Sequence, residues 1–394
     1  MAHIIDIILF VLLAFSVAYV AFFAIVAAVC RNPHDGNAPK DERLMRFLVI
    51  FPSYGEDNVI VDSATSFLRQ HYPRDKYQVT VVSDHQTPAT NRRLSLLPLR
   101  LLTPVFAKST KAQALQCAVS DAIAQGAAYD YAVILDADNI VEPDFLPRLN
   151  NSCLYGYRAI QCHRKAKNHD TDVAVVDGAS EEINNTLFRL AHNRAHLSAS
   201  LIGSGVCIDF RWLSLNVGRL HTAGEDREME ALLLAQHIYI RYEDDIYVYD
   251  EKVSDMGGFQ RQRQRWVAAQ ARSLAAMFPH IPHAIATRNI DYIDKTIQQA
   301  LIPRSMLIVM TVAIAVVVTL LSPLSAIKWW ALLALLIIAL LLALPKPMRS
   351  WRLLSKWTTA LLMTLRMFRS ASHIASDKGD FIHTSHHNSK EPQQ

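Results

Sequence analysis

The sequence predicts an α/β domain with a mostly parallel sheet, flanked by membrane-spanning helices. Apolar residues make up 51% of the 394 residues and charged residues 19%, which is apolar for a wholly soluble protein. The apolar residues concentrate towards the two ends of the chain. Between them, short β-branched runs alternate with helical segments, as they do in parallel sheets with crossover helices.

The first expected element is an apolar run near the N-terminus. It extends from Ile4 to Val29 and is interrupted by Asp6. About 20 helical residues cross the hydrocarbon core of a bilayer, so the run is long enough. A cleaved signal peptide is the alternative, but the run is too long for one, lacks a basic segment before it and has no clear cleavage site. We therefore expect residues 1–30 to form a retained transmembrane helix.

Three apolar runs in the middle domain, residues 31–280, are predicted to be buried strands. They are Arg46–Phe51, which ends at Pro52, then Gln78–Ser83 and Tyr131–Leu135. Two segments with helical character lie between them, Val59–Gln70 and Lys111–Ala124. Ligands of parallel sheets bind beyond the carboxyl ends of the strands. The residues that follow each strand are therefore the candidates for a functional site.

Polar and aromatic side chains follow all three predicted strands. They are Pro52, Tyr54 and Glu56 after the first strand, Asp84 after the second, and Asp136 and Asp138 after the third. On an extended chain, two carboxylates two positions apart point the same way. Asp136 and Asp138 would then form a hard oxygen site for Mg²⁺ or Mn²⁺, which shares its coordination shell with substrate phosphates. A loop-capping role is the alternative for such an acidic pair.

A second acidic pair, Glu225 and Asp226, begins a predicted helix in the segment HTAGEDREME. The simpler interpretation is a favourable interaction with the helix dipole, worth about 0.3–1 kcal/mol. The functional interpretation is a general base that takes a proton from a substrate hydroxyl.

The segment QRQRQRW places three side chains on one face of a predicted helix. Gln262, Arg265 and Trp266 stand at positions i, i+3 and i+4, which are neighbours on a helix surface. Arginine binds a diphosphate bidentately and keeps its charge, and the tryptophan ring is suited to cover a sugar ring. The alternative is a basic face towards solvent or a membrane surface.

Composition excludes several classes of protein. The net charge of +4 is too small to indicate a nucleic-acid partner, and no nucleic-acid-binding motif accompanies the basic segment. The five cysteines form no CxxC pair, which argues against a disulfide framework or a zinc site.

A second apolar block, residues 305–344, is expected to form two transmembrane spans after an interfacial connection at 281–304. The block breaks at Pro323, which lacks an N–H and disfavours continued helix. The expected spans are Ser305–Leu321 and Trp329–Leu344, and the expected interfacial anchors are Lys328, Trp329 and Trp330. A re-entrant hairpin is the alternative, since each span is short for a full crossing.

The segments after the last span are expected to lie on the cytoplasmic side. Residues 345–375 interleave Trp, Leu and Met with Arg and Lys, which predicts an amphipathic helix in the interface, with a fourth span as the alternative. Residues 376–394 are expected to be a cytoplasmic tail. Arg and Lys follow the first and last spans, and none precedes the first. The positive-inside rule therefore predicts an integral protein of the inner or plasma membrane with a cytoplasmic middle domain.

Taken in order, these motifs resemble those of the processive-type family-2 glycosyltransferases. That group includes cellulose, chitin and hyaluronan synthases and bacterial poly-N-acetylglucosamine synthases. The resemblance covers residues 46–270 together with the flanking apolar segments. It implies a GT-A-type nucleotide-sugar-binding domain whose donor is a UDP-sugar.

The resemblance implies a donor site. Asp84 resembles the nucleobase-binding Asp of the family, and Lys111 resembles the lysine of its KAxxLN segment, with Gln116 in place of Asn. Asp136 and Asp138 match its DxD metal motif. The residues implied to contact the donor are Pro52, Tyr54, Glu56, Asp84, Lys111 and Asp136, together with Gln262, Arg265 and Trp266, which match the QxxRW motif in full.

The resemblance also implies an acceptor site and a base. Gly203, Ser204 and Gly205 resemble the small-residue loop near the acceptor, which Trp266 would also contact. Glu225 and Asp226 match the family's ED pair, and Asp226 stands where the base is found.

The tail contains a segment that resembles the gating loop FxVTxK of cellulose synthases. Phe381 and Thr384 match that pattern, whereas His383 replaces Val and His386 replaces Lys. Such a loop would cover the bound donor. A disordered tail is the alternative.

The implied activity is inverting transfer of sugar from a UDP-sugar to a growing β-linked polysaccharide, with Mg²⁺ or Mn²⁺. Transfer of a single sugar to a lipid or lipid-linked acceptor is one alternative, and a catalytically silent assembly subunit is another. Two C-terminal spans make a thin secretion channel. A homo-oligomer or a secretion partner could complete it.

Overall fold

The computed structural model describes residues 2–31, 42–222, 224–253, 256–349 and 355–356. Its sheet has eight strands in the order β3-β2-β1-β4-β7-β6-β8-β5. The strands are β1 (Phe47–Tyr54), β2 (Tyr77–Asp84), β3 (Arg100–Leu102), β4 (Tyr131–Ile134), β5 (Ile140–Val141), β6 (Ala159–Ala166), β7 (Val206–Asp209) and β8 (Ile240–Asp250). Strands β3, β2, β1 and β4 are parallel to one another, and β6 is parallel to β8. Strand β7 is antiparallel to β4 and β6, and β5 is antiparallel to β8. The prediction of a mostly parallel sheet is confirmed.

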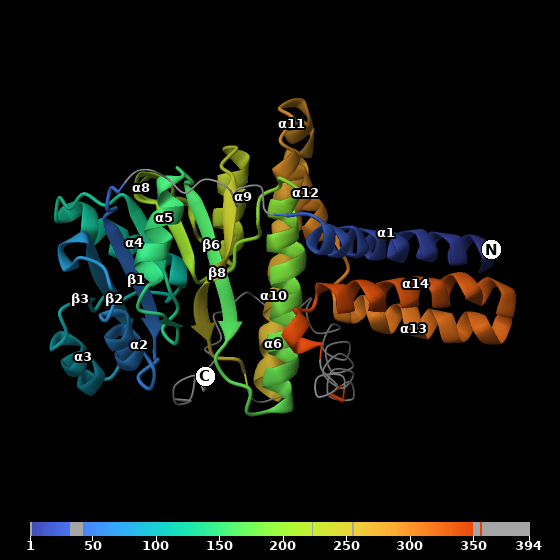
Figure 1. Cartoon of the computed structure of the whole chain (residues 1–394), viewed down its shortest axis with the longest axis horizontal. Coiled ribbons are helices and arrows are strands. Elements are labelled where there is room, and N and C mark those ends of the chain that lie inside the picture. The colour runs from blue at the N-terminus through green and yellow to red at the C-terminus, as the bar shows by residue number, and fades with distance from the viewer. Residues whose placement is uncertain (1, 32–41, 223, 254–255, 350–354, 357–394) are drawn as a thin grey trace.

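Helices cover both faces of this sheet, and three long apolar helices extend away from it. Those before β8 are α1 (Ala2–Val29), α2 (Ile60–Phe67), α3 (Pro88–Ser95), α4 (Lys111–Ala124), α5 (Phe145–Leu154), α6 (Asp172–Asn185), the π-helical segment η2 (Thr186–Leu190), α7 (Ala191–Arg194), α8 (Phe210–Asn216) and α9 (Glu225–Ala235). Those after it are α10 (Met256–Met277), α11 (Ile281–Ala286), α12 (Ile290–Ala300), α13 (Arg304–Leu321) and α14 (Pro323–Ala343). Figure 1 shows α6 and α10 standing between the sheet and the helices α1, α13 and α14. The expected connection at 281–304 contains α11 and α12, and α12 packs against α9 and α10.

Strand β1 is buried on both faces because its side chains alternate between two cores. Leu48 and Ile50 pack with α4 and α9 on one face. Phe47, Val49 and Phe51 pack with α2 and α5 on the other. Since successive side chains of a strand point to opposite faces, a strand covered on both sides reads as one continuous apolar run.

Strand β1 is longer than the sequence predicts. Its end is expected at Pro52, but it continues to Tyr54, and Pro52 pairs with Val82 of β2. β1 pairs with β4 only over Phe47–Ile50, so at Pro52 the strand has a ladder partner on one side alone. Proline is tolerated where one side of a strand carries no ladder. The extension places Tyr54 opposite Asp84 at the end of β2.

The helices α1, α13 and α14 pack side by side through apolar side chains (Figure 1). Each is long and apolar enough to cross a membrane. Their shared core contains Leu13 and Val17 of α1, Ala315 of α13, and Trp329 and Leu336 of α14. α14 begins at Pro323 and not, as expected, at Trp329. Proline is accommodated in the first turn of a helix because the N–H groups there have no intrahelical partner.

Trp329 is not an interfacial anchor in this structure. Its side chain is completely buried against α1, and its Nε1 donates a hydrogen bond to Oδ1 of Asp6 at 2.8 Å. Lys328 pairs with the other oxygen of Asp6. The carboxylate that interrupts the N-terminal apolar run therefore has its partners on α14.

A polar network joins α1 to the α/β domain. The hydroxyl of Tyr19 donates a hydrogen bond to Oδ1 of Asp294 in α12 at 2.7 Å. His192 of α7 is completely buried, and its Nε2 lies 3.0 Å from the Tyr19 hydroxyl and 3.2 Å from Asp294. The ring of Phe23 stacks on His192 with 3.8 Å between centroids. These contacts fix the C-terminal half of α1 against α7 and α12.

Asp6→Ala should destabilise the bundle of apolar helices, because it leaves Lys328 without its carboxylate and Trp329 without its acceptor. Hydrogen bonds to charged groups contribute about 1.5–3 kcal/mol, and a loss of that order should lower the thermal unfolding temperature in detergent. The double variant Asp6→Ala, Lys328→Met also removes the unpaired cation, so it should recover part of the loss. A double variant no more stable than Asp6→Ala would contradict this role of the pair.

Candidate active site

The residues predicted at the strand ends meet at one edge of the sheet. The carboxyl ends of β1, β2 and β4 reach this edge because the three strands are parallel. β7 runs antiparallel to β4, so the loop that precedes it, residues 203–205, arrives at the same edge. The first turns of α4 and α9 bring Lys111 and Glu225 there.

Lys111 is the centre of this arrangement. Its Nζ pairs with Oδ1 of Asp136, donates a hydrogen bond to the carbonyl oxygen of Gly203, and lies 3.8 Å from Oε1 of Glu225. Thr110 caps α4 by accepting a hydrogen bond from the backbone N–H of Gln113. The cap defines the first turn of the helix, on which Lys111 stands.

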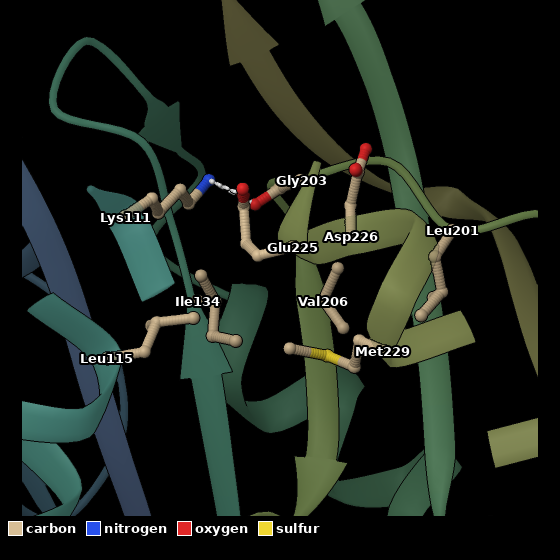
Figure 2. Close-up of a pocket in the computed structure, with 9 residues that line it drawn as sticks. All are labelled: Lys111, Leu115, Ile134, Leu201, Gly203, Val206, Glu225, Asp226 and Met229. Atoms are coloured by element: carbon tan, nitrogen blue, oxygen red, sulfur yellow. Dashed lines mark hydrogen bonds and ion pairs between the residues drawn. The ribbon is translucent and has the colours of Figure 1, made fainter. Parts of the chain in front are cut away.

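A small pocket opens beside Lys111 (Figure 2). Lys111 and Glu225 point towards each other at its rim, and the carboxylate of Asp226 lies apart from this pair. The rest of the lining is Gly203 and the apolar side chains of Leu115, Ile134, Leu201, Val206 and Met229. An apolar lining excludes water and strengthens the interactions between the charges above it.

Burial raises the pKa of Glu225 to about 8, although the positive charge of Lys111 opposes this rise. Desolvation lowers the pKa of Lys111, but the carboxylates of Asp136 and Glu225 outweigh it and hold that pKa above its usual value. Lys111 is therefore charged at neutral pH and Glu225 is protonated. Asp136 is the carboxylate that compensates the lysine.

Asp136 and Asp138 lie at a turn after β4 and not, as expected, on an extended chain. The two carboxylates consequently have different partners. Asp136 pairs with Lys111, whereas Oδ2 of Asp138 accepts a hydrogen bond from the backbone N–H of Glu251 at 2.9 Å. The side-chain amide of Asn139 donates to Asp138 and to Asp250 at 3.2 and 3.3 Å.

The donor atoms of this turn fit a hard divalent cation. Asp136 and Asp138 offer carboxylate oxygens, which Mg²⁺ and Mn²⁺ prefer. The described residues contain no group of three or more His, Cys, Asp and Glu side chains that could hold a metal ion. A cation at the turn would therefore take further ligands from phosphate oxygens and water, as Mg²⁺ commonly does.

Asp84 and Tyr54 lie side by side at the ends of β2 and β1. Asp84 is buried, and Nδ1 of the following His85 lies 2.6 Å from its Oδ1. The ring of His85 lies 4.9 Å from that of Tyr54. His85 has a φ of 59°, a conformation uncommon outside glycine and frequent at functional sites. A carboxylate beside two aromatic rings suits a heterocycle with N–H donors. His85 is a candidate residue of this site that the sequence analysis missed.

The loop of small residues is required sterically. A Cβ on Gly203 would lie 3.1 Å from Nζ of Lys111, and a Cβ on Gly205 would lie 3.0 Å from Cγ2 of Val248. Gly205 also has a φ of 67°. Ser204 is completely buried, and its hydroxyl has no hydrogen-bond partner within the described part of the chain. A side chain at residue 203 would therefore press on Lys111, and one at residue 205 would press on Val248.

Helix α10 passes the start of α9 and carries the predicted Gln262, Arg265 and Trp266. A Cβ on Gly224 would lie 3.6 Å from Cβ of Ala269, which stands one turn beyond Arg265 and Trp266. The Oε1 atom of Gln262 is buried and has no hydrogen-bond partner among the described residues. The tertiary structure thus brings this motif close to the acidic pair that follows Gly224.

A buried charge network behind the Asp136 turn was not predicted. Asp250 ends β8, accepts a hydrogen bond from Asn139 and lies 2.8 Å from Nζ of Lys252. Arg164 and Lys252 lie 2.9 and 3.1 Å from Oε2 of Glu181 in α6. Burial alone would raise the pKa of Glu181, but these cations hold it well below its usual value. The available signal in the sequence is that Asp250 and Lys252, like Asp136, stand at a strand end.

Some sequence predictions lie outside the described residues. These are the gating loop with Phe381, Thr384 and His386, and most of the amphipathic helix expected at 345–375. From the latter segment, Lys356 lies 2.7 Å from Asp172 at the start of α6.

Residues 131–343 match the family described as glycosyl transferase family group 2, and residues 48–213 match glycosyl transferase family 2. The first match covers more than half of the chain. A comparison with curated proteins gives no match.

Several solved structures are similar to this chain. The mannosyltransferase PcManGT from Pyrobaculum calidifontis, in complex with GDP-Man and Mn²⁺, is 21% identical, with 95% of this chain and 99% of that chain covered and a TM-score of 0.56. S. aureus TarS 1-349 with UDP-GlcNAc is 14% identical (88% and 98% covered, TM-score 0.43). Glucosyl-3-phosphoglycerate synthase from Mycobacterium tuberculosis is 15% identical (58% and 80% covered, TM-score 0.41). The likeness to the mannosyltransferase shows that the α/β domain has a GT-A-like fold.

The raised pKa of Glu225 makes stability depend on pH. Between 4.5, the ordinary value, and about 8, the folded protein holds a proton that the unfolded chain has released, so stability falls as pH rises through this window. Glu225→Gln removes this titration. Relative to wild type, its unfolding temperature should be similar near pH 5 and a few degrees higher near pH 9. Asp62→Asn, which removes an exposed carboxylate of α2, is the control. If the stability of Glu225→Gln kept the pH dependence of the wild type, the raised pKa would not belong to Glu225.

Gly205→Ala should destabilise the protein through both backbone strain and contact with Val248. A non-glycine residue at positive φ costs about 1–3 kcal/mol, and the close contact adds to that cost. Gly126→Ala is the matched control, because Gly126 has a φ of 65° but a Cβ added there would meet nothing within 4 Å. Thermal unfolding of the two variants should show the larger loss for Gly205→Ala. Equal losses would show that the loop does not need the close approach.

Proposed function

The chain belongs to glycosyl transferase family group 2, and we propose that it transfers a single sugar from a nucleotide sugar to a lipid-linked acceptor at a membrane. It is a glycosyltransferase. The observation that supports the proposed reaction is the juxtaposition of Lys111, Asp136 and the pair Glu225 and Asp226 at one sheet edge. The three apolar helices lie on the far side of α10 from this edge (Figure 1).

The donor is proposed to be a UDP-sugar that spans the sheet edge. Asp84 offers a buried carboxylate to the N–H of the base, and Tyr54 and His85 offer aromatic faces. The diphosphate would lie near Lys111, whose ammonium attracts it, and Arg265 would approach from α10. The mannosyltransferase structure holds GDP-Man and Mn²⁺, which is consistent with a nucleotide sugar and a divalent cation at this edge.

Asp136 and Asp138 would hold Mg²⁺ or Mn²⁺ against the diphosphate. When bound, the cation neutralises negative charge that develops on the diphosphate as the bond to the sugar breaks. Lys111 contributes to the same stabilisation as a fixed positive charge in a largely buried site.

Asp226 is proposed to be the general base of an inverting single displacement. It takes the proton of the acceptor hydroxyl, the hydroxyl oxygen forms a bond to the anomeric carbon, and the electron pair of the old bond leaves with the diphosphate. Glu225 is less suited to this role, because it pairs with Lys111 and its pKa of about 8 keeps it protonated at neutral pH. Asp226 stands apart from that pair in Figure 2.

The packing of the apolar helices favours a lipid-linked acceptor over a secreted polymer. Leu13, Trp329 and Leu336 are completely buried where α1 meets α14, so side chains fill the interior of the described bundle. Such a bundle suits a protein that meets its acceptor at the membrane surface. We propose that α1, α13 and α14 lie in an inner or plasma membrane and that the α/β domain is cytoplasmic.

Extension of a β-linked polysaccharide is the second candidate. Gln262, Arg265 and Trp266 complete the motif that the sequence shares with polymer synthases, and this observation favours processive transfer. The polymer would need a passage made by a second copy of the chain or by a partner protein.

The test measures product length together with the role of Asp226. Detergent-purified protein receives a panel of UDP-sugars, Mg²⁺ or Mn²⁺, and a membrane lipid extract, and mass spectrometry follows the products. One added sugar on a lipid supports the proposal, whereas a lipid-free ladder of sugars supports the polymer. Asp226→Asn should lower UDP release about 100-fold or more, the usual contribution of a general base, while UDP affinity stays within a few-fold. Asp62→Asn should match wild type. Lost UDP affinity with near-normal UDP release would show that Asp226 is not the base.

A further inference from the structure

A group of charged side chains surrounds α6 and comes from β6, η2, the end of β8, α10 and α13, and we name it the cationic cluster. Its cations are Arg164, Arg189, Lys252, Arg263 and Arg304, and its carboxylates are Asp177, Glu181 and Asp250. Five cations therefore face three carboxylates. Neither the donor site nor the base uses this excess of positive charge.

Two of the carboxylates are occupied by three of the cations. Oε2 of Glu181 lies 2.9 Å from Arg164 and 3.1 Å from Lys252, and its Oε1 lies 3.7 Å from Arg189. Asp250 lies 2.8 Å from Lys252 and 3.7 Å from Arg164. These three cations and two carboxylates leave one net positive charge, and neither carboxylate is available to the rest of the cluster.

Arg263 and Arg304 are the two remaining cations, and Asp177 is the one remaining carboxylate. Nη2 of Arg263 pairs with Asp177. In the described part of the chain, Arg304 has no carboxylate partner and is held by neutral acceptors, the carbonyl oxygen of Ser180 at 3.1 Å and Oδ1 of Asn184 at 2.7 Å. Nη2 atoms of both arginines also contact the hydroxyl of Ser180, at 3.3 and 3.4 Å. The two guanidinium groups therefore meet at Ser180, and only that of Arg263 has a carboxylate partner.

Two donor atoms of this arginine pair are unsatisfied. Nε of Arg263 and Nη1 of Arg304 are buried and have no hydrogen-bond partner among the described residues. A desolvated cation without an acceptor or a counter-charge costs free energy. A phosphate group supplies both, because two of its oxygens can accept parallel hydrogen bonds from a planar guanidinium group. The pair therefore points to an anionic ligand.

The arginine pair lies between the apolar helices and the transfer site. Arg304 is the first residue of α13, one of the helices apolar enough to cross a membrane. The guanidinium of Arg263 lies 4.6 Å from the ring centre of Trp266. Ala269, where the start of α9 approaches α10, stands six positions beyond Arg263, which is a rise of about 9 Å along the helix.

We propose that Arg263 and Arg304 bind the phosphate or diphosphate group of the lipid-linked acceptor, an inference that rests on the proposed function. The lipid chain would extend from the start of α13 along the apolar helices. The rise of about 9 Å along α10 separates Arg263 from the position beside the start of α9, so the headgroup would extend along α10 towards Asp226. The reacting hydroxyl is then on a headgroup beyond the phosphate. The acceptor class is a saccharide joined to a lipid through phosphate or diphosphate.

The experiment measures binding of three probes to the full-length protein in detergent, with saturating UDP to fill the donor site. The probes are farnesyl diphosphate, farnesol and inorganic pyrophosphate. Wild type should bind farnesyl diphosphate at least tenfold more tightly than either other probe. Arg304→Gln should weaken that binding at least tenfold, and Arg304→Lys, which keeps the charge but loses the planar fork, should weaken it less. Arg92→Gln removes an exposed arginine of α3 and should bind as wild type does.

Several outcomes would overturn the proposal. Unchanged affinity of Arg304→Gln for farnesyl diphosphate would exclude the arginine pair as the binding site. If thermal unfolding shows that Arg304→Gln does not fold, Arg263→Gln is measured in its place. Equal binding of farnesol would indicate an apolar site, and equal binding of pyrophosphate would indicate a free-anion site. UDP release by wild type is measured separately. Its absence would overturn the proposed function, while selective binding of farnesyl diphosphate would still establish the lipid-phosphate site.

Discussion

The ammonium group of Lys111 joins four parts of the chain: the start of α4, the turn after β4, the loop before β7 and the start of α9. Without it, Asp136 and Glu225 would meet as uncompensated carboxylates in a partly desolvated site, which is unfavourable for both. Its charge opposes the rise that burial causes in the pKa of Glu225, and the neighbouring carboxylates in turn hold the pKa of Lys111 above its usual value. A donor diphosphate would compete for the same ammonium, so donor binding and the protonation of Glu225 are expected to be coupled.

Charges shared between distant segments also connect the sheet to the apolar helices. Glu181 and Asp250 join β6, β8 and α6, and Asn139 links Asp250 to the turn that carries Asp138. Arg304, the first residue of α13, donates hydrogen bonds to Ser180 and Asn184 of α6. The proposed metal turn and the start of the apolar helix α13 are therefore both joined to α6 through polar contacts.

Local pattern predicted much of the fold, and its errors have identifiable causes. The limits of α4 agree with the prediction, because its sequence is a continuous run of good helix formers. Two predicted boundaries were wrong: β1 continues past Pro52, and α14 begins at Pro323 and not at Trp329. Both errors arise because the effect of a proline depends on its neighbours. Pro52 lacks a second strand beside it, and Pro323 falls in a first turn. Trp329 was assigned to an interface because the sequence does not show that Asp6 lies opposite it.

The sequence by itself determined the alternation of strands and helices, the three apolar helices and the order of the acidic and basic motifs, because each depends on residues near one another along the chain. The tertiary structure decided which charge meets which partner. Lys111 meets Glu225 because β7 runs antiparallel to β4 and α9 begins at the same edge. Arg263 meets Arg304 because α10 and α13 both pack against Ser180 of α6. Ionic partners far apart in sequence are set by topology and burial, and neither leaves a periodic signal in the chain.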